Sequence, residues 1–180
     1  SERSRGLGDV YKRQSNMRPI ETEPNLNISA YLGTWNQVAT SRSTKLMGTG
    51  VQYTNVSAHY GPSEEGLSVY NSGYDENGVF QSITGYSYIN GDSETKRKLH
   101  FDVSPVDGNY WIPKLGPILH GEYQYSIVCG PLTSYFGTRA SLYVLARNRQ
   151  QYKQLYEDEV KQWCVDNGFV FHWNEYVETN

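Results

Sequence analysis

A regular succession of strand-like segments is the feature of this 180-residue sequence that most constrains its fold. Short runs rich in Tyr, Val, Ile and Thr alternate with Gly, Pro, Asn or Asp, the residues that form tight turns. Seven strands are predicted in this way, at Val51–Tyr60, Leu67–Tyr74, Val79–Ile89, Lys98–Ser104, Asn109–Leu115, Tyr123–Cys129 and Ser141–Arg147. The connections Asp75–Gly78 and Asn90–Asp92 offer residues that tolerate the positive φ of hairpin turns.

An eighth strand is predicted before these seven, over Thr34–Ser41. Alternation places its side chains on two faces, with Trp35, Gln37 and Ala39 on one and Asn36, Val38 and Thr40 on the other. Gly33 allows a tight entry into the strand, and the Trp35 indole can plug one end of a barrel. Eight antiparallel strands with short connections predict an all-β fold, a closed up-and-down barrel able to hold one small ligand. A two-sheet sandwich without a cavity is the structural alternative.

The hydrophobic period changes after the last of these strands. Arg149–Val165 carries apolar residues at three- and four-residue spacing, which predicts an amphipathic helix packed on the outside of the barrel. Asn167-Gly168 is a suitable helix end. A short final strand, Phe169–Trp173, is expected to pair beside the first strand.

The N-terminal residues do not contribute to this pattern. Ser4–Gln14 back-translates without mismatch into a transposase adapter used in sequencing libraries, so residues 1–14 are interpreted as a translated adapter scar. Residues 15–27 are then an extended lead-in, residues 28–175 the domain and residues 176–180 a tail. A start at Met17 predicts a cytoplasmic protein, whereas a lost N-terminal signal would make it secreted, periplasmic or membrane-anchored.

Composition excludes several classes of function. The net charge of −3 with interspersed signs argues against nucleic-acid binding, for which a basic patch is expected. No stretch is long and apolar enough for a membrane helix, so a soluble protein is expected. Cys129 and Cys164 lack metal-like spacing and leave open whether they pair in a disulfide. No metal site and no cofactor are predicted.

Several motifs occur together in an order that resembles a known family. YLGTW at Tyr31–Trp35 is followed by a long loop, then by GLSVYNSGYDENGVF, YWI, EYQYSIVCGP, LYVLAR and the amphipathic helix. This order is similar to that of the lipocalins, in particular their bacterial-lipocalin and apolipoprotein-D-like branch. The resemblance implies that Arg147 crosses Trp35 in a cation–π contact and seals the closed end of the barrel together with Gly33. Two segments depart from the family pattern, Leu119–Tyr123 and Ser134–Ala140.

The resemblance implies binding and carriage of a small hydrophobic ligand, a fatty acid, lysophospholipid or similar lipid. Strand alternation together with the family's inward faces predicts a ligand-binding set that is apolar with a few polar tips. The set is Gln37, Ala39, Tyr53, Val69, Asn71, Ile83, Phe101, Trp111 and Tyr143. We also expect that such a protein can contact a membrane surface peripherally. We expect it to be either a monomer or a homodimer.

Two other classes remain as alternatives. Some lipocalins are enzymes: some are isomerases that use a cysteine of the barrel, and others use acidic residues in the epoxide chemistry of pigments. In this sequence, Asp75, Glu76 and the four histidines form no evident catalytic constellation. No catalytic residue is therefore predicted, and Cys129 near a strand end is interpreted as a structural thiol. A haem-binding barrel would use His59 or His100, although alternation points His100 outward.

Overall fold

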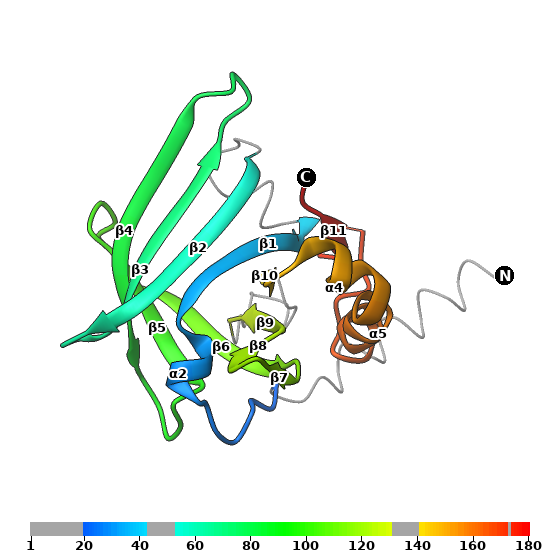
Figure 1. Cartoon of the computed structure of the whole chain (residues 1–180), viewed down its shortest axis with the longest axis horizontal. Coiled ribbons are helices and arrows are strands. Elements are labelled where there is room, and N and C mark those ends of the chain that lie inside the picture. The colour runs from blue at the N-terminus through cyan, green and yellow to red at the C-terminus, as the bar shows by residue number, and fades with distance from the viewer. Residues whose placement is uncertain (1–19, 43–52, 131–140, 173) are drawn as a thin grey trace, which may run out of the picture.

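Eight strands form a closed antiparallel barrel in the computed structural model, which describes residues 20–42, 53–130, 141–172 and 174–180 (Figure 1). The strands of the barrel are β1 (Gly33–Ser41), β2 (Thr54–Ser63), β3 (Gly66–Tyr74), β4 (Phe80–Ile89), β5 (Lys96–Phe101), β6 (Gly108–Leu115), β9 (Tyr125–Cys129) and β10 (Leu142–Ala146). Each pairs with its neighbour in sequence, and β10 pairs with both β9 and β1, which closes the sheet. The prediction of a closed up-and-down barrel is confirmed, and the sandwich alternative is excluded.

The closed end of the barrel carries two short elements. The one-turn helix α2 (Ile28–Tyr31) begins at Asn27, whose side chain accepts a hydrogen bond from the Ala30 N–H. Strands β7 (Ile118–Leu119) and β8 (Glu122–Tyr123) form a hairpin around His120 and Gly121, which have φ values of 53° and 78°. Positive φ at both central residues is the conformation of a tight two-residue hairpin turn. The segment that departs from the family pattern thus forms a regular hairpin, whereas Ser134–Ala140 lies outside the described residues.

Two helices pack on the outside of the barrel where one was predicted. They are α4 (Arg149–Leu155) and α5 (Glu157–Asp166), separated at Tyr156, where φ is −126°. Tyr152, Val160 and Cys164 face the barrel and are buried. The amphipathic pattern was therefore right about the buried face, but the single helix is interrupted.

The last strand lies later in the chain than predicted. β11 (Tyr176–Glu178) pairs with β1, so residues 176–180 are not a free tail. Phe169–His172 are not in a strand, and Trp173 lies outside the described residues. Asn174 explains the difference, because its side chain accepts from the Phe171 N–H at 2.9 Å and donates to the Gly168 carbonyl at 3.1 Å, which fixes a turn there.

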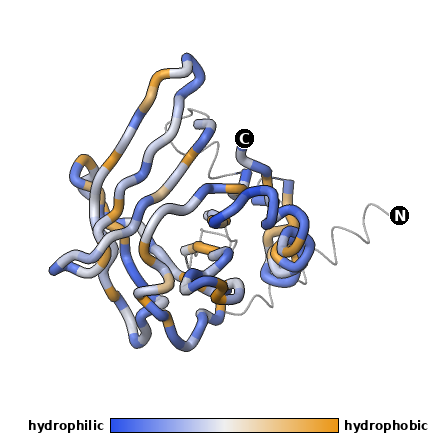
Figure 2. Tube along the Cα trace, in the orientation of Figure 1, coloured by the Kyte–Doolittle hydropathy of each residue, from blue (hydrophilic) through white to orange (hydrophobic). Residues whose placement is uncertain are grey.

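Hydrophobic side chains form two clusters on opposite faces of the barrel wall. One lies between the wall and helices α4 and α5, and the other fills the closed half of the barrel interior around Trp35. Orange and blue residues are interspersed along the strands, as expected for walls that are apolar on one face (Figure 2). Within the described part of the chain, no helix has the length and apolar character needed to span a membrane.

Candidate ligand-binding site

The floor of the barrel, which we define as Gly33, Trp35 and Arg147, closes one end of the interior. Trp35 is completely buried, and its indole N–H donates to the Tyr31 carbonyl at 2.9 Å. The Arg147 guanidinium carbon lies 3.8 Å from the centre of the Trp35 ring, within the range of a cation–π contact. The three residues that the resemblance singled out are therefore in contact at this end.

Arg147 also joins the chain segments that meet at the floor. Its guanidinium donates to the carbonyls of Ala30, Leu32, Thr34 and Tyr123 at 2.8–3.2 Å. Gly33 has a φ of +99°, and a Cβ added there would lie 3.2 Å from Arg147 Nη1. Glycine is therefore needed at this position both for the backbone conformation and for the approach of the guanidinium.

A chain of buried hydroxyl groups lies directly above the floor. Tyr31 Oη is 2.7 Å from Tyr110 Oη and 3.0 Å from Ser126 Oγ, and Tyr110 donates to Tyr60 Oη at 2.8 Å. Burial raises the pKa of all three tyrosines, so these phenols stay protonated. The chain ends at Tyr60, whose ring borders open space.

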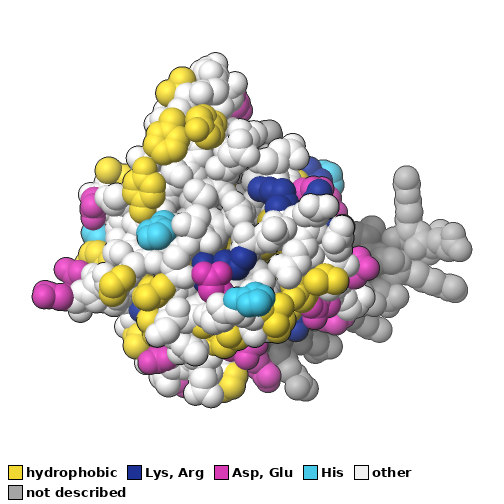
Figure 3. All heavy atoms as spheres, in the orientation of Figure 1, with side chains coloured by type: hydrophobic (Ala, Val, Ile, Leu, Met, Phe, Trp, Pro, Cys, Tyr) yellow, Lys and Arg dark blue, Asp and Glu magenta, His cyan; other side chains and the backbone are white. Residues whose placement is uncertain are grey.

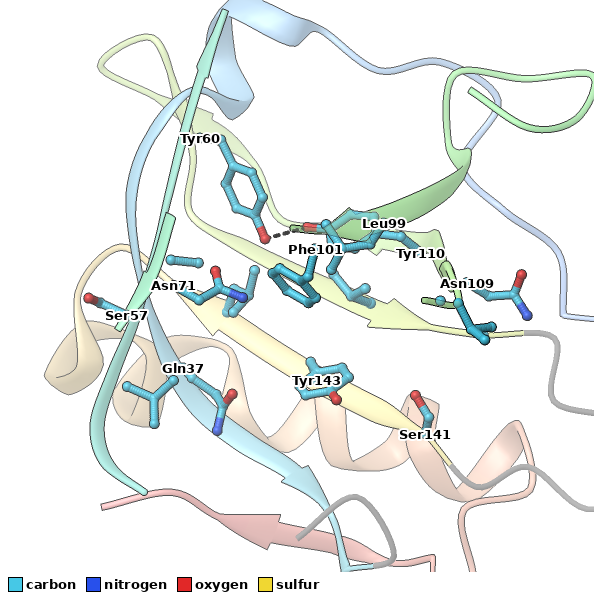
Figure 4. A pocket seen from close by; sticks show the side chains of 17 residues that line it. Gln37, Ser57, Tyr60, Asn71, Leu99, Phe101, Asn109, Tyr110, Ser141 and Tyr143 are labelled. Carbon is cyan, nitrogen blue, oxygen red and sulfur yellow. Dashed lines mark hydrogen bonds between the residues drawn. The ribbon is translucent and has the colours of Figure 1, made fainter. Parts of the chain in front are cut away.

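A cavity of about 420 Å³ occupies the interior beyond Tyr60 (Figure 4). Its walls come from β1, β2, β3, β5, β6, β9 and β10. The lining residues are Gln37, Val56, Ser57, Ala58, Tyr60, Asn71, Leu99, Phe101, Val106, Gly108, Asn109, Tyr110, Val128, Gly130, Ser141, Tyr143 and Leu145. The size lies within the range of small-molecule sites, and the walls are mostly apolar.

The polar groups on these walls are uncharged. Among the described residues that line the cavity, none is Asp, Glu, Lys, Arg or His. Asn71 Oδ1 is buried and has no hydrogen-bond partner. Figure 4 shows the Asn71 side chain between Tyr60 and Gln37, directed toward Phe101 across the cavity. An unpaired buried acceptor carries a free-energy cost that a bound donor would remove.

The structure places the predicted ligand-binding residues in three groups. Gln37, Asn71, Phe101 and Tyr143 line the cavity together. Val69 is buried in the cluster around Trp35, and Ile83 pairs with Asn71 but lies outside the lining. Tyr53 precedes β2 and is 38% exposed.

Two predicted residues, Ala39 and Trp111, lie outside the barrel interior. Gln37 pairs with Leu145 and Ala39 with Val144, so a β-bulge at Val38 inserts one extra residue and places Ala39 on the helix side. Trp111 pairs with Lys96, whose ammonium lies over the indole at 5.1 Å, while its neighbour Tyr110 lines the cavity. Assigning these two residues to the cavity was wrong, because the bulge interrupts the alternation before Ala39, and because alternation at Trp111 gives two faces but not which one is inside.

Several lining residues were not predicted, although some could have been. Leu99 and Leu145 lie two positions from Phe101 and Tyr143, so they share a face by strand alternation. Tyr60 and Tyr110 carry no such signal. Their place follows from which strands meet across the interior.

The residues considered for catalysis or haem binding lie away from the cavity. His59 Nδ1 is 2.9 Å from Thr34 Oγ1 at an exposed site, and His100 Nδ1 is 2.8 Å from Asp107 Oδ1. His120 and His172 are exposed. Cys129 is buried in the cluster beneath the helices together with Cys164, where burial raises the pKa of the Cys164 thiol to about 12.

Two acidic candidates belong to the β3–β4 connection. Asp75 accepts hydrogen bonds from the backbone N–H groups of Asn77 and Val79, which is a role in the turn, and Glu76 is exposed in the same turn. In the described ranges, no three His, Cys, Asp or Glu side chains gather in a group that could hold a metal ion.

Comparison with known proteins gives one family for most of the chain. A family model described as a lipocalin-like domain matches residues 26–172. The chain is 30% identical over 148 residues to outer membrane lipoprotein Blc of Escherichia coli K12, covering 81% of this chain and 72% of that protein. It is 29% identical over 161 residues to temperature-induced lipocalin-1 of Arabidopsis thaliana, covering 84% of this chain and 78% of that protein.

Solved structures share the fold at lower identity. Insecticyanin from the tobacco hornworm Manduca sexta superposes with a TM-score of 0.66 at 17% identity, covering 91% of this chain and 85% of that one. Apocrustacyanin C2 superposes with a TM-score of 0.61 at 16% identity, covering 96% and 83%. These similarities concern the barrel and its outer helices rather than the ligand.

Proposed function

Because this chain belongs to the lipocalin-like family, as its motifs predicted, we propose that it binds and carries a single-chain lipid in the barrel cavity. The family and the fold indicate binding of a small hydrophobic ligand in general. A fatty acid, lysophospholipid or similar lipid is the finer part of the proposal.

The observation that carries the proposal is the cavity itself. It is closed at one end by the floor and lined by apolar side chains such as Leu99, Phe101 and Val128, and the polar groups among them are uncharged. Burial of an acyl chain contributes about 0.8 kcal/mol per methylene, so a chain of moderate length supports micromolar binding without a charged anchor.

Native mass spectrometry of the purified protein, with extraction of co-purifying lipid, tests this function. Tyr143→Ala removes a lining ring that is 37% exposed, and Tyr70→Ala removes a ring that is 41% exposed on the outer face beside His59. We expect Tyr143→Ala to weaken binding of a fluorescent fatty acid about tenfold and Tyr70→Ala to leave it unchanged. The proposal would be contradicted if the purified protein contains no lipid and binds none that is added. It would also be contradicted if the two variants change the affinity for the fluorescent fatty acid equally.

Catalysis is not part of the proposed function. The alternatives that used Cys129 or a cavity histidine lack support, since these side chains do not line the cavity. We therefore expect binding without turnover, to be checked by recovering added lipid chemically unchanged after incubation.

The rim of the barrel supports a peripheral contact with a lipid surface as a second, weaker part of the proposal. Tyr74, Val79 and Phe80 flank the tip of the β3–β4 hairpin and are 41%, 52% and 50% exposed. Figure 3 shows hydrophobic side chains at that tip. Co-sedimentation with phosphatidylcholine vesicles should be lost in Phe80→Ser if this tip makes the contact.

The E. coli relative's name, an outer membrane lipoprotein, supports a membrane-associated or exported location.

A further inference from the structure

We infer that the cavity selects a lipid whose polar end is uncharged and both donates and accepts hydrogen bonds, such as a primary amide or an alcohol, held between Tyr60 and Asn71. This inference rests on the proposed function and narrows it, because among the single-chain lipids proposed there it expects those with an uncharged polar end to bind the cavity more tightly than an ionised fatty acid. Three observations lead to it: the direction of the buried hydroxyl chain, the unpaired oxygen of Asn71 and the absence of charge from the described walls.

The hydroxyl chain has a direction that ends in the cavity. Tyr110 uses its single hydrogen to donate to Tyr60 Oη at 2.8 Å. Tyr31 must therefore donate to Tyr110, and Ser126 must donate to Tyr31, because each hydroxyl has one hydrogen. In the described part of the chain, Tyr60 donates no hydrogen bond of its own. Its O–H is therefore a donor available to an acceptor atom of a ligand.

Asn71 supplies the complementary group on the adjacent strand. Its Oδ1 is buried in the cavity wall without a partner. Tyr60 pairs with Val69, and Ala58 with Asn71, so Tyr60 and Asn71 lie two residues apart along the β2–β3 pair. Both residues line the cavity, and Figure 4 shows the Tyr60 hydroxyl and the Asn71 amide on the same side of it. A donor at Tyr60 and an acceptor at Asn71 therefore suit one head group.

The charge of the walls excludes ionised head groups from this position. The described residues that line the cavity provide no cation for a carboxylate or a phosphate. Placing an unpaired charge against these apolar walls costs far more free energy than one hydrogen bond returns. A carboxylate also lacks the hydrogen that Asn71 Oδ1 would accept.

The cavity volume sets the length of the ligand. A volume of about 420 Å³ lies in the lower part of the range of small-molecule sites, which favours a single acyl chain of moderate length such as dodecyl. Dodecanamide, dodecan-1-ol, methyl dodecanoate and dodecanoate are therefore matched probes that share a chain and differ in the polar end. The amide and the alcohol can both donate and accept hydrogen bonds, the ester can only accept them, and the carboxylate is charged.

Displacement of a fluorescent probe by these four ligands tests the inference. We expect dodecanamide and dodecan-1-ol to bind the unaltered protein about tenfold more tightly than methyl dodecanoate, the value of one well-formed buried hydrogen bond. Dodecanoate should bind at least as weakly as the ester. Equal binding of amide and ester, or tighter binding of dodecanoate, would overturn the inference and leave the proposed function standing.

Two variants separate the roles of the two residues. Asn71→Leu should abolish the preference for amide over ester, because it removes the acceptor while preserving volume. Tyr60→Phe should weaken amide and ester by a similar factor, because both present a carbonyl to the lost O–H. Asn90→Leu makes the same amide-to-leucine change at an exposed turn position outside the cavity lining and should leave the preference intact.

The fold of each variant can be monitored by near-UV circular dichroism and thermal melting. Asn71→Leu is expected to melt at the same temperature as the unaltered protein or higher, because it removes an unpaired buried acceptor. Retention of the amide preference in a folded Asn71→Leu protein would overturn the assignment of Asn71. Failure of every dodecyl ligand and of the fluorescent probe to bind the unaltered protein would instead overturn the proposed function as well.

Discussion

The two halves of the barrel interior satisfy their polar groups in different ways. At the floor, the Trp35 indole and the Arg147 guanidinium donate to backbone carbonyls, and the guanidinium stacks on the ring. In the cavity half, Asn71 Oδ1 has no partner and the Phe101 ring borders open space. The contrast teaches that this fold concentrates stabilising contacts at one end and leaves apolar surface and unpaired polar atoms at the other, where a ligand can use them.

The largest expected effect comes from removing the ring at the centre of the floor. Trp35→Ala should lower the free energy of unfolding by about 3–5 kcal/mol, because it leaves a cavity in a fully packed cluster. Phe101→Ala should cost only about 1–2 kcal/mol, below the usual range for a buried ring, because one side of the ring already faces space. Urea denaturation measures both values. Similar losses in the two variants would show that the two halves do not differ in packing.

Loss of the arginine at the floor should have the next largest effect. Arg147→Ala leaves four carbonyl groups without their donor and removes the cation–π contact, which should cost about 2–4 kcal/mol. Arg42→Ala is the matched control, since Arg42 forms a half-exposed ion pair with Glu175 at 2.8 Å, worth about 0–1 kcal/mol. Urea denaturation compares the two variants. If Arg147→Ala is as stable as Arg42→Ala, the contacts of Arg147 at the floor do not stabilise the protein more than a surface ion pair does.

A smaller effect is expected from the glycine that the arginine approaches. Gly33→Ala should cost about 2 kcal/mol, because it combines a left-handed backbone with a Cβ 3.2 Å from Arg147 Nη1. Gly78→Ala, at φ +73° in the β3–β4 turn with open space around it, should cost about 1 kcal/mol from the backbone alone. Thermal melts of both variants test the difference. If Gly33→Ala melts no lower than Gly78→Ala, the approach of Arg147 does not constrain this position.

The smallest effect concerns the pH dependence of a cluster at the rim. Asp107 accepts hydrogen bonds from Tyr88 and His100, and these contacts lower the pKa of the Asp107 carboxyl. A pKa below that of the unfolded chain means that this contribution is present above about pH 4 and is lost as the pH falls through the folded value. The melting temperatures of the unaltered protein and Asp107→Asn should therefore differ at pH 6 and converge toward pH 3. A difference that grows as the pH falls would have the wrong sign for this cluster.

The sequence by itself determined the barrel, its outer amphipathic segment and the residues of the floor. Strand alternation, turn residues and the change of hydrophobic period are local properties, so each could be recognised within a few neighbouring residues. Gly33, Trp35 and Arg147 were found because they lie in motifs at the two ends of the barrel sequence. Gln37, Asn71, Phe101 and Tyr143 followed from alternation along regular strands together with the inward faces that the family resemblance implies.

Only the tertiary structure decided which groups face the cavity and how they connect. One extra residue at Val38 reverses the face of Ala39, and no local pattern marks such a bulge. Trp111 and Tyr110 are adjacent aromatic residues, and only the packing of the strands places one outside and one inside. The hydroxyl chain joins Tyr31 to Tyr110, 79 positions away, so its direction toward Tyr60 depends on contacts that form only when the sheet closes.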